Sequence, residues 1–283
     1  MKKQNMKDTV YTAACGAWIG GTMTVPGVSG GSMAMILGIY DRLISSVNGI
    51  FRKGTFKESL AFLIKFMLGA VLGLFLVAKL ITLALTHFSI PTRYFFLGAV
   101  AGCAPMIFRE AKVKKVGIPV FLYPIIGIVC ALLITLIPEG IFEIRGNGVL
   151  AVIAGVVIQL LGGIVIAVAL VLPGISVSQM LLVLGVYEKL TAAVDALDIM
   201  TLLSFAPLVI GTMGGILLTT SLIERAMKKY PTATYLIVFG FILGSLPELF
   251  PAQMLTGWNL LFAPLLALLG FLAVFAIAKK ENA

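Results

Sequence analysis

The sequence predicts an all-α polytopic membrane protein built from two inverted repeats, each made of one re-entrant helical hairpin and three transmembrane helices. Three observations lead to this prediction. The chain is 60% hydrophobic and 12% charged, with a mean hydropathy of +1.10. One motif occurs twice, and the basic residues gather in alternate loops.

Composition sets the class of protein. Soluble domains carry about 25% charged residues, and several apolar runs here reach the about 20 residues that cross a bilayer. The early lysines precede an apolar stretch, as in a signal peptide, but no A-x-A site follows, so we expect this segment to be retained. The net charge of +9 is scattered over short loops, which argues against a nucleic-acid partner.

The repeated motif recurs at an offset of 147 residues. Residues 25–43 read VPGVSGGSMAMILGIYDRL, and residues 172–190 read LPGISVSQMLLVLGVYEKL. Both copies keep a Pro-Gly-x-Ser turn, a Leu-Gly-x-Tyr segment and an acidic residue followed by a basic one. A duplicated turn of this kind in a very apolar chain is typical of transporters with two repeats and interrupted helices.

Each copy of the motif joins two apolar segments without a polar loop. The first pair covers about 9–25 and 28–40, and the second covers about 149–172 and 175–187. A segment of about 13 residues gives roughly 20 Å of helix, which is too short for about 30 Å of hydrocarbon. We therefore expect two re-entrant hairpins, whose tips are buried in protein or line a watery cavity.

The same order of elements follows in both halves, which are expected at 1–145 and 146–283. The predicted elements are hairpin 9–43 and helices 60–86, 94–108 and 116–138, then hairpin 149–190 and helices 201–223, 232–248 and 258–278. Matching small-x-x-x-small pairs, which let helices approach closely in lipid, support this alignment at an offset of 142 residues. They are Gly69/Gly73 with Gly211/Gly215, and Gly98/Gly102 with Gly240/Gly244.

The distribution of Lys and Arg predicts the orientation. Three crossings per repeat place both termini in the cytoplasm and invert the second repeat relative to the first. The cytoplasmic loops then hold 16 of the 21 basic residues: Lys2, Lys3, Lys7, Arg42, Arg52, Lys53, Lys57, Arg109, Lys112, Lys114, Lys115, Arg225, Lys228, Lys229, Lys279 and Lys280. The outer loops hold Arg93, Arg145 and Lys189. This is the positive-inside pattern expected in the bacterial cytoplasmic membrane.

The two hairpin tips are the candidate binding site for an anion. Glycine backbone lets a ligand approach closely, and free N–H groups at a helix start attract phosphate. The residues assigned to this site are Pro26, Gly27, Ser29, Gly30, Gly31 and Ser32 in the first tip, and Gly174, Ser176, Ser178 and Gln179 in the second. We expect the tips to meet near the mid-plane, the first holding the phosphate and the second assisting or gating. A kink or a surface loop is the alternative for each Pro-Gly, and the duplication favours the site.

Charged residues near the tips are candidates for a gate or a first contact with an anionic head group. They are Asp41, Arg42, Glu188, Lys189 and Lys79. Arginine suits bidentate phosphate binding, but interfacial anchoring of a helix end explains the two acid–base pairs equally well. Lys79 either snorkels to the interface or faces the interior as a substrate or coupling residue.

Carboxylates give no guide to a coupling ion. Glu110, Glu139 and Glu248 fall at helix ends, where solvated or capping roles are the expectation. No clear protonatable carboxylate falls at mid-depth, so the sequence gives no support for proton coupling, and coupling to a proton or a sodium gradient is left open.

A hydrolase is the competing chemistry. Residues 27–31 fit G-x-S-x-G, but that nucleophile elbow needs a strand-turn-helix context and a base. The single histidine, His87, lies in a predicted outer loop, away from Ser29. No metal-binding or nucleotide-binding motif is present, so we expect neither an enzyme nor a cofactor.

The double motif also resembles a known family. The residues that carry the resemblance are PGVSGG at 26–31 with LGIYDRL at 37–43, echoed by PGIS at 173–176 with LGVYEKL at 184–190. They resemble a bacterial and archaeal membrane family associated with polyprenyl-phosphate transport, over nearly the whole chain. The resemblance implies a translocase that returns undecaprenyl phosphate from the outer to the inner leaflet for cell-wall synthesis. From the residues alone, a transporter or channel for a small soluble anion is the alternative, and an intramembrane serine hydrolase a more remote one.

Overall fold

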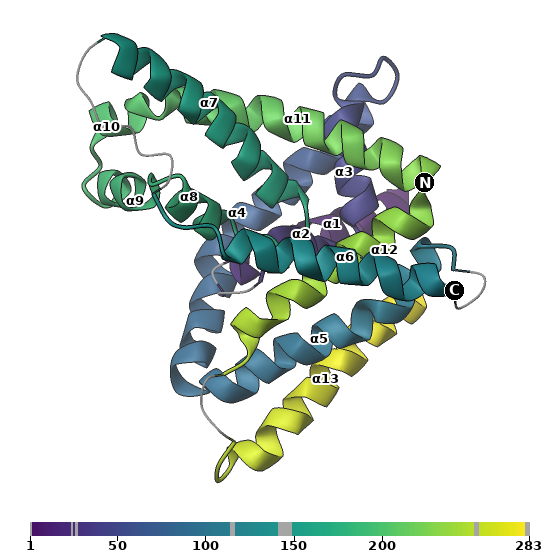
Figure 1. Ribbon diagram of the computed structural model, residues 1–283. Helices are drawn as coiled ribbons and strands as arrows, with labels where there is room; N and C mark the ends of the chain where they lie inside the picture. Colours follow the sequence, from purple (N-terminus) through teal and green to yellow (C-terminus); the bar gives the residue numbers. More distant parts are fainter. Residues whose placement is uncertain are drawn as a thin grey trace.

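The computed structural model describes residues 2–23, 25, 28–113, 117–140, 149–251 and 255–280. In these residues every regular element is a helix, with thirteen α-helices, one 3₁₀-helix and no strand. The expected all-α class is confirmed. The start of α1 and the end of α13 lie at the same end of the molecule (Figure 1).

The helices follow the order of the predicted segments. The first half contains α1 (Lys2–Thr22), α2 (Gly30–Ile36), α3 (Tyr40–Gly49), α4 (Phe56–His87), α5 (Ser89–Glu110) and α6 (Ile118–Thr135). The second half contains α7 (Val149–Val171), α8 (Val177–Val183), α9 (Tyr187–Asp195), α10 (Ile199–Ser204), α11 (Ala206–Lys229), α12 (Pro231–Ser245), η1 (Leu246–Leu249) and α13 (Asn259–Lys280). The expected helix over 232–248 becomes a 3₁₀ turn after Ser245, where Pro247 supplies no N–H to an α-helix.

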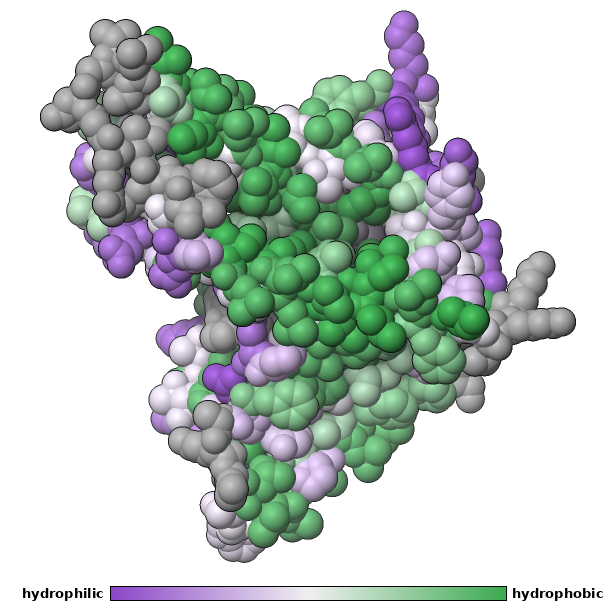
Figure 2. Space-filling model, in the orientation of Figure 1, coloured by the Kyte–Doolittle hydropathy of each residue, from purple (hydrophilic) through white to green (hydrophobic). Residues whose placement is uncertain are grey.

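Seven helices in the described residues are long and apolar enough to cross a membrane. They are α4, α5, α6, α7, α11, α12 together with η1, and α13. Their outer faces expose large apolar side chains, with Phe75 70% and Phe121 64% exposed. In Figure 2 hydrophobic residues cover α6 and α7, while most hydrophilic residues lie toward two opposite margins of the view. Apolar surface this extensive needs a hydrocarbon solvent, so this is a multi-pass membrane protein.

Close helix pairs within each half depend on glycine. α4 packs on α1, and α11 packs on α7. A Cβ at Gly69 would overlap the carbonyl oxygen of Ala13, and a Cβ at Gly211 would overlap that of Leu160. These glycines let the backbones touch, as the small-x-x-x-small pairs predicted.

Two further close pairs join the halves. α5 packs on α13, and α12 packs on α6. A Cβ at Gly98 would overlap the carbonyl oxygen of Ala267, and a Cβ at Gly240 would overlap that of Pro124. Each half therefore contributes one helix to each of these two pairs.

The second limb of each hairpin is broken by glycine. α2 and α8 have seven residues each, and Gly38 and Gly185 then adopt φ angles of 71° and 69°. The N–H of Ile39 donates to the carbonyl of Ala34 at 3.0 Å, which is the six-residue return bond of a Schellman cap, and the second copy makes the equivalent bond at 3.0 Å. The repeated Leu-Gly-x-Tyr segment is therefore a helix C-cap. This corrects the expectation of one helix per limb.

Candidate functional site

The first tip is organised by Ser29. This residue has extended backbone before α2, and its Oγ accepts the N–H of Ser32 at 3.1 Å. The two serine hydroxyl oxygens lie 2.7 Å apart. Ser29 is thus an N-cap, a role for which serine is strongly preferred. Pro26 and Gly27, two of the expected site residues, lie outside the described residues.

The second tip repeats this geometry around Ser176. Its backbone is also extended, and its Oγ accepts the N–H of Gln179 at 3.4 Å, a longer bond than in the first tip. Gly174 has a φ of 83°, and a Cβ there would overlap the carbonyl oxygen of Phe241 in α12. Only glycine satisfies both the left-handed conformation and the lack of space.

The two tips touch each other. The N–H of Gly174 donates to Ser29 Oγ at 2.9 Å, across 145 residues of sequence. A Cβ on Gly31 would lie only 3.0 Å from the backbone nitrogen of Pro173. The hydroxyl of Tyr40, beyond the first tip, donates to the carbonyl of Val171 at 2.9 Å. Ser29 therefore caps its own helix and binds the opposite tip with the same oxygen.

One cavity of about 510 Å³ lies against both tips. Five of the residues assigned to the site line it: Ser29, Gly30, Gly174, Ser176 and Ser178. The other described members do not. Gly31 and Ser32 are buried, with Gly31 against Pro173, and Gln179 lies beside the cavity without lining it.

Three residues of the cavity were not predicted from sequence. They are Tyr187 at the start of α9, Ser245 at the end of α12, and Glu248 in η1. Glu248 was expected at a solvated or capping position; it is exposed, and the 3₁₀ turn of η1 also places it among the residues that line the cavity. Its backbone carbonyl accepts a bond from Arg93 of α5 at 3.1 Å, which attaches this turn to the bundle.

The cavity combines hydroxyl donors and the carboxylate of Glu248 with apolar side chains. Hydroxyl groups come from both tips and from Tyr187 and Ser245, and apolar contacts come from Met23, Val28 and Leu170. A helix dipole grows with the number of aligned peptides, and α2 and α8 have only two turns each. An anion here would be held by hydroxyl and backbone donors more than by helix dipoles.

Asp41 and Arg42 point to different partners. Both guanidinium nitrogens of Arg42 donate to Asp8, at 2.6 and 3.0 Å, and the group lies 4.5 Å from the ring centre of Phe62. Hydrogen bonding from Arg42 lowers the pKa of Asp8. Asp41 instead accepts a hydrogen bond from the hydroxyl of Tyr235 in α12. Neither side chain lines the tip cavity.

The other charged candidates also lie away from the tips. Lys79 is exposed on the outer face of α4, among exposed leucines such as Leu76 and Leu80. Glu188 is exposed, and Lys189 lines a neighbouring cavity of about 500 Å³ together with Gln159. The exposed position of Lys79 fits the snorkelling alternative rather than contact with a substrate.

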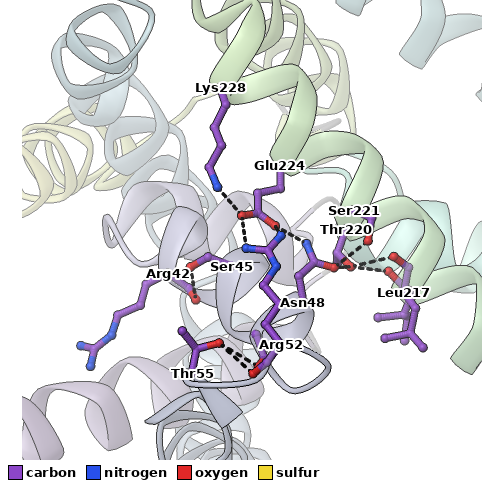
Figure 3. Close-up of polar contacts among 12 residues, drawn as sticks. Arg42, Ser45, Asn48, Arg52, Thr55, Leu217, Thr220, Ser221, Glu224 and Lys228 are labelled. Atoms are coloured by element: carbon purple, nitrogen blue, oxygen red, sulfur yellow. Dashed lines mark hydrogen bonds and ion pairs between the residues drawn. The ribbon is translucent and has the colours of Figure 1, made fainter.

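A polar cluster that sequence reasoning missed joins the two halves at the other end of α3. Glu224 of α11 is 5% exposed. It accepts bonds from Asn48 at 2.7 Å, from both guanidinium nitrogens of Arg52 at 3.1 and 2.8 Å, and from Lys228 at 2.5 Å. Figure 3 shows Glu224 and Lys228 reaching from α11 toward Asn48 and Arg52.

The same cluster includes a second layer of hydroxyl groups. Asn48 Oδ1 accepts bonds from Thr220 and Ser221, each at 2.9 Å. These bonds fix the orientation of the amide, so that its nitrogen faces Glu224. We call Asn48, Arg52, Thr220, Ser221, Glu224 and Lys228 the α3–α11 cluster. No spacing pattern in the sequence connects Asn48 with residues 172 or more positions away.

Comparison with known proteins gives the family. A family model described as VCA0040-like, undecaprenyl phosphate translocase-like, matches residues 19–260. A polyprenyl-phosphate transporter of Staphylococcus aureus is 30% identical over 235 residues, which cover 80% of this chain and 81% of that protein. One of Vibrio cholerae is 29% identical over 256 residues, covering 86% and 78%. No solved structure matches the chain significantly. The matched region contains both tips, the cavity and the α3–α11 cluster, and the chain belongs to the undecaprenyl phosphate translocase-like family, whose members are transporters and not enzymes.

Proposed function

We propose that this protein carries polyprenyl phosphate from the outer to the inner leaflet of the bacterial cytoplasmic membrane, with the head group bound between the hairpin tips. The observation that carries the proposal is the meeting of both tips at one cavity of about 510 Å³. The relatives in S. aureus and V. cholerae are polyprenyl-phosphate transporters, which supplies the substrate class. Hydroxyl donors suit the phosphate, and the apolar lining suits the first part of the lipid tail.

An inverted repeat is the architecture that we propose for this transport. The contact between Gly69 and Ala13 corresponds to the contact between Gly211 and Leu160. The glycines are 142 positions apart and their partners are 147 positions apart, which are the two offsets expected from the sequence. α5 corresponds to α12, and α6 corresponds to α13. The α5–α13 pair therefore corresponds to the α12–α6 pair, and in each pair a helix of one half packs on a helix of the other. Such an exchange is expected from a twofold relation lying in the membrane plane, as in other transporters with interrupted helices.

We infer that the present arrangement is open to the outside. α3 packs against α4 and α11, whereas its counterpart α9 packs against α8 and α10. Tyr187 and Glu248 of the cavity lie on the side that the basic residues assign to the exterior. The α3–α11 cluster lies on the side assigned to the cytoplasm, together with both termini. Alternating access would then require this cluster to separate while α9 closes over the cavity.

A leaflet-resolved assay tests the proposal. Purified protein is reconstituted into phosphatidylcholine liposomes that contain undecaprenyl phosphate, and a soluble phosphatase added outside releases phosphate from outward-facing head groups alone. We expect nearly all of the lipid phosphate to become accessible with the protein, and about half without it. Liposomes loaded with inorganic phosphate form the second arm. Release of that anion without movement of the lipid would instead support a channel for a small soluble anion.

Serine substitutions at the two tips are expected to differ in effect. Ser29→Ala removes the helix cap and the acceptor for Gly174, and an N-cap alone contributes about 1 kcal/mol, as does an ordinary hydrogen bond. Ser176→Ala removes a longer cap bond and one hydroxyl of the cavity, but no hydrogen bond between the tips. We therefore expect a roughly tenfold loss of transport for Ser29→Ala and less than threefold for Ser176→Ala. Equal losses, measured in the phosphatase assay, would contradict the assigned role of Ser29.

A larger side chain at Gly30 is expected to obstruct the cavity without unfolding the protein. A Cβ there would meet only the flexible side chains of Met23 at 3.3 Å and Ile19 at 3.5 Å. Gly30→Val should therefore lower transport by about tenfold or more while the melting temperature changes by a few degrees. The control is Gly214→Val in α11, where nothing lies within 4 Å of a Cβ. Equal transport by the two variants would place the head group elsewhere.

A further inference from the structure

We propose that Glu248 binds a monovalent cation, a proton or a sodium ion, which crosses the membrane together with the lipid phosphate. This inference rests on the proposed function, because it concerns the electrostatics of the same cavity. Glu248 contributes the carboxylate of that cavity, and the described lining contains no Lys or Arg.

The position of Glu248 is set by its backbone. η1 follows α12 directly, and its N-terminal part includes Pro247. The carbonyl of Glu248 accepts the bond from Arg93 at 3.1 Å, so the arginine of α5 binds the main chain of this turn. Glu248 is exposed and is one of the residues that line the cavity, beside the phosphate site that the tips form.

The other polar side chains that line the cavity with Glu248 are hydroxyl groups. They are the phenol of Tyr187 from α9, the hydroxyl of Ser245 from α12, and the hydroxyls of Ser29, Ser176 and Ser178 from the tips. The guanidinium of Arg93 is the cation known to contact this turn from α5. These oxygen atoms can also complete the coordination of a sodium ion, and the end of a short helix is a place where transporters bind sodium or protons.

Electrostatics favour a cation at Glu248. A phosphate bound beside the Glu248 carboxylate is repelled by it. Binding a proton or a sodium ion at Glu248 removes this repulsion, so the cation and the phosphate each favour the binding of the other. A carrier with this property moves both together.

The position of Glu248 is not repeated as a carboxylate in the other half. At the offset of 142 residues the counterpart of Glu248 is Met106, which lines a cavity on the opposite side with Tyr40 and Asp41. The counterpart of Tyr187 in that cavity is Tyr40, so the tyrosine is repeated. That cavity also holds the carboxylates of Asp41 and Glu110 and the guanidinium of Arg109, whereas the described lining of the Glu248 cavity contains no Lys or Arg.

The test imposes cation gradients on the liposomes described above. Valinomycin and equal potassium concentrations inside and outside the liposomes hold the membrane potential at zero. A brief phosphatase pulse then reports the steady-state distribution of undecaprenyl phosphate between the two leaflets. If one proton accompanies each lipid, a difference of one pH unit should shift the ratio between leaflets about tenfold. If one sodium ion does so, a tenfold sodium gradient should give the same shift. Both results are independent of the orientation of the protein in the liposome.

Variants assign the response to Glu248. Glu248→Gln should distribute the lipid equally between leaflets under either gradient, whereas Glu248→Asp should retain the response. The matched control is Glu139→Gln, an exposed glutamate at the same expected side of the membrane and outside the cavity lining. A gradient response that survives Glu248→Gln, or a wild type that ignores both gradients, would overturn the inference. A wild type that moves no lipid phosphate at all would instead refute the proposed function.

Cation binding is also measured directly, so that an inactive variant remains informative. A bound cation stabilises the folded protein as its concentration rises above the dissociation constant. The melting temperature of wild type and Glu248→Asp in detergent should therefore rise with sodium or with acid, and that of Glu248→Gln should not. The same rise in all three proteins would overturn the inference.

Discussion

Replacing Gly174 by alanine is expected to abolish transport and to lower the free energy of unfolding by roughly 2–5 kcal/mol. The left-handed conformation costs an L-residue about 1–2 kcal/mol, and Gly174 has a φ of 83°. The new methyl group would also overlap the carbonyl of Phe241 in α12, and forcing such overlap costs about 1–3 kcal/mol more. Relief of the overlap requires the second tip to move away from α12.

Movement of this tip would also break the contact between the halves. The N–H of Gly174 is the donor to Ser29 Oγ, so a displaced tip leaves Ser29 with its own helix cap alone. We therefore expect loss of lipid movement in the phosphatase assay together with a lower melting temperature in detergent.

Gly54→Ala separates the two causes. Gly54 has a φ of 106°, and nothing lies within 4 Å of a Cβ built on it. Alanine there adds conformational strain but no overlap, so we expect a loss of about 1–2 kcal/mol with transport retained. If Gly174→Ala moved lipid as well as Gly54→Ala does, the tips would not form the transport site.

Local patterns in the sequence were sufficient to predict the elements that a repeat encodes. Segment lengths and hydropathy located the helices, because hydrocarbon imposes a length of about 20 residues on each crossing. The duplicated glycine pairs predicted close helix contacts, and the structure places Gly69 and Gly211 at such contacts. The Leu-Gly-x-Tyr segment was recognised as a repeat, but its role as a helix cap was not. A positive φ at Gly38 depends on where the helix ends, which hydropathy does not define.

Long-range polar contacts could not be predicted in the same way. Tyr40 was noticed as a repeated residue, yet its partner is the carbonyl of Val171, 131 positions away. Glu248 follows a proline at the end of an apolar segment, which is also the sequence context of an ordinary solvated glutamate. Only the packing of η1 beside the tips distinguishes the two situations. Backbone carbonyls and packing directions carry no mark in a single sequence.

Glu224→Gln is expected to open the end of the protein that we assign to the cytoplasm. Glu224 is 5% exposed and holds Arg52, Asn48 and Lys228 together. The Glu224 side chain is 6% exposed, but those of Arg52 and Lys228 are 54% and 69% exposed. Loss of the carboxylate charge should therefore cost less than in a fully buried pair, about 1–3 kcal/mol. The α3–α11 cluster is formed only while α3 packs on α11, and about 1.4 kcal/mol already changes a population ratio tenfold. The substitution should therefore shift the protein toward the state that we assign as open to the cytoplasm.

Cysteine labelling measures this shift. Ile44 lines the cavity beside Glu224 and is 3% exposed, so Ile44→Cys reports opening at this end. The background carries Cys130→Ala, because Cys15 and Cys103 are buried and Cys130 is only partly so. With Glu224→Gln we expect a membrane-impermeant maleimide to label Cys at position 44 at least about tenfold faster, since even 1.4 kcal/mol corresponds to a tenfold change in population.

The control removes a different ion pair, which joins α1 to α3. Asp8→Asn breaks the bond between Asp8 and Arg42, whose side chains are 40% and 44% exposed. Exposed pairs contribute about 0–1 kcal/mol, so labelling and transport should both stay near wild type. Lipid movement by Glu224→Gln should fall, because a carrier held open on one side returns slowly to the other. If labelling at position 44 were the same with and without Glu224→Gln while transport fell, the cluster would stabilise the fold without closing the cytoplasmic side.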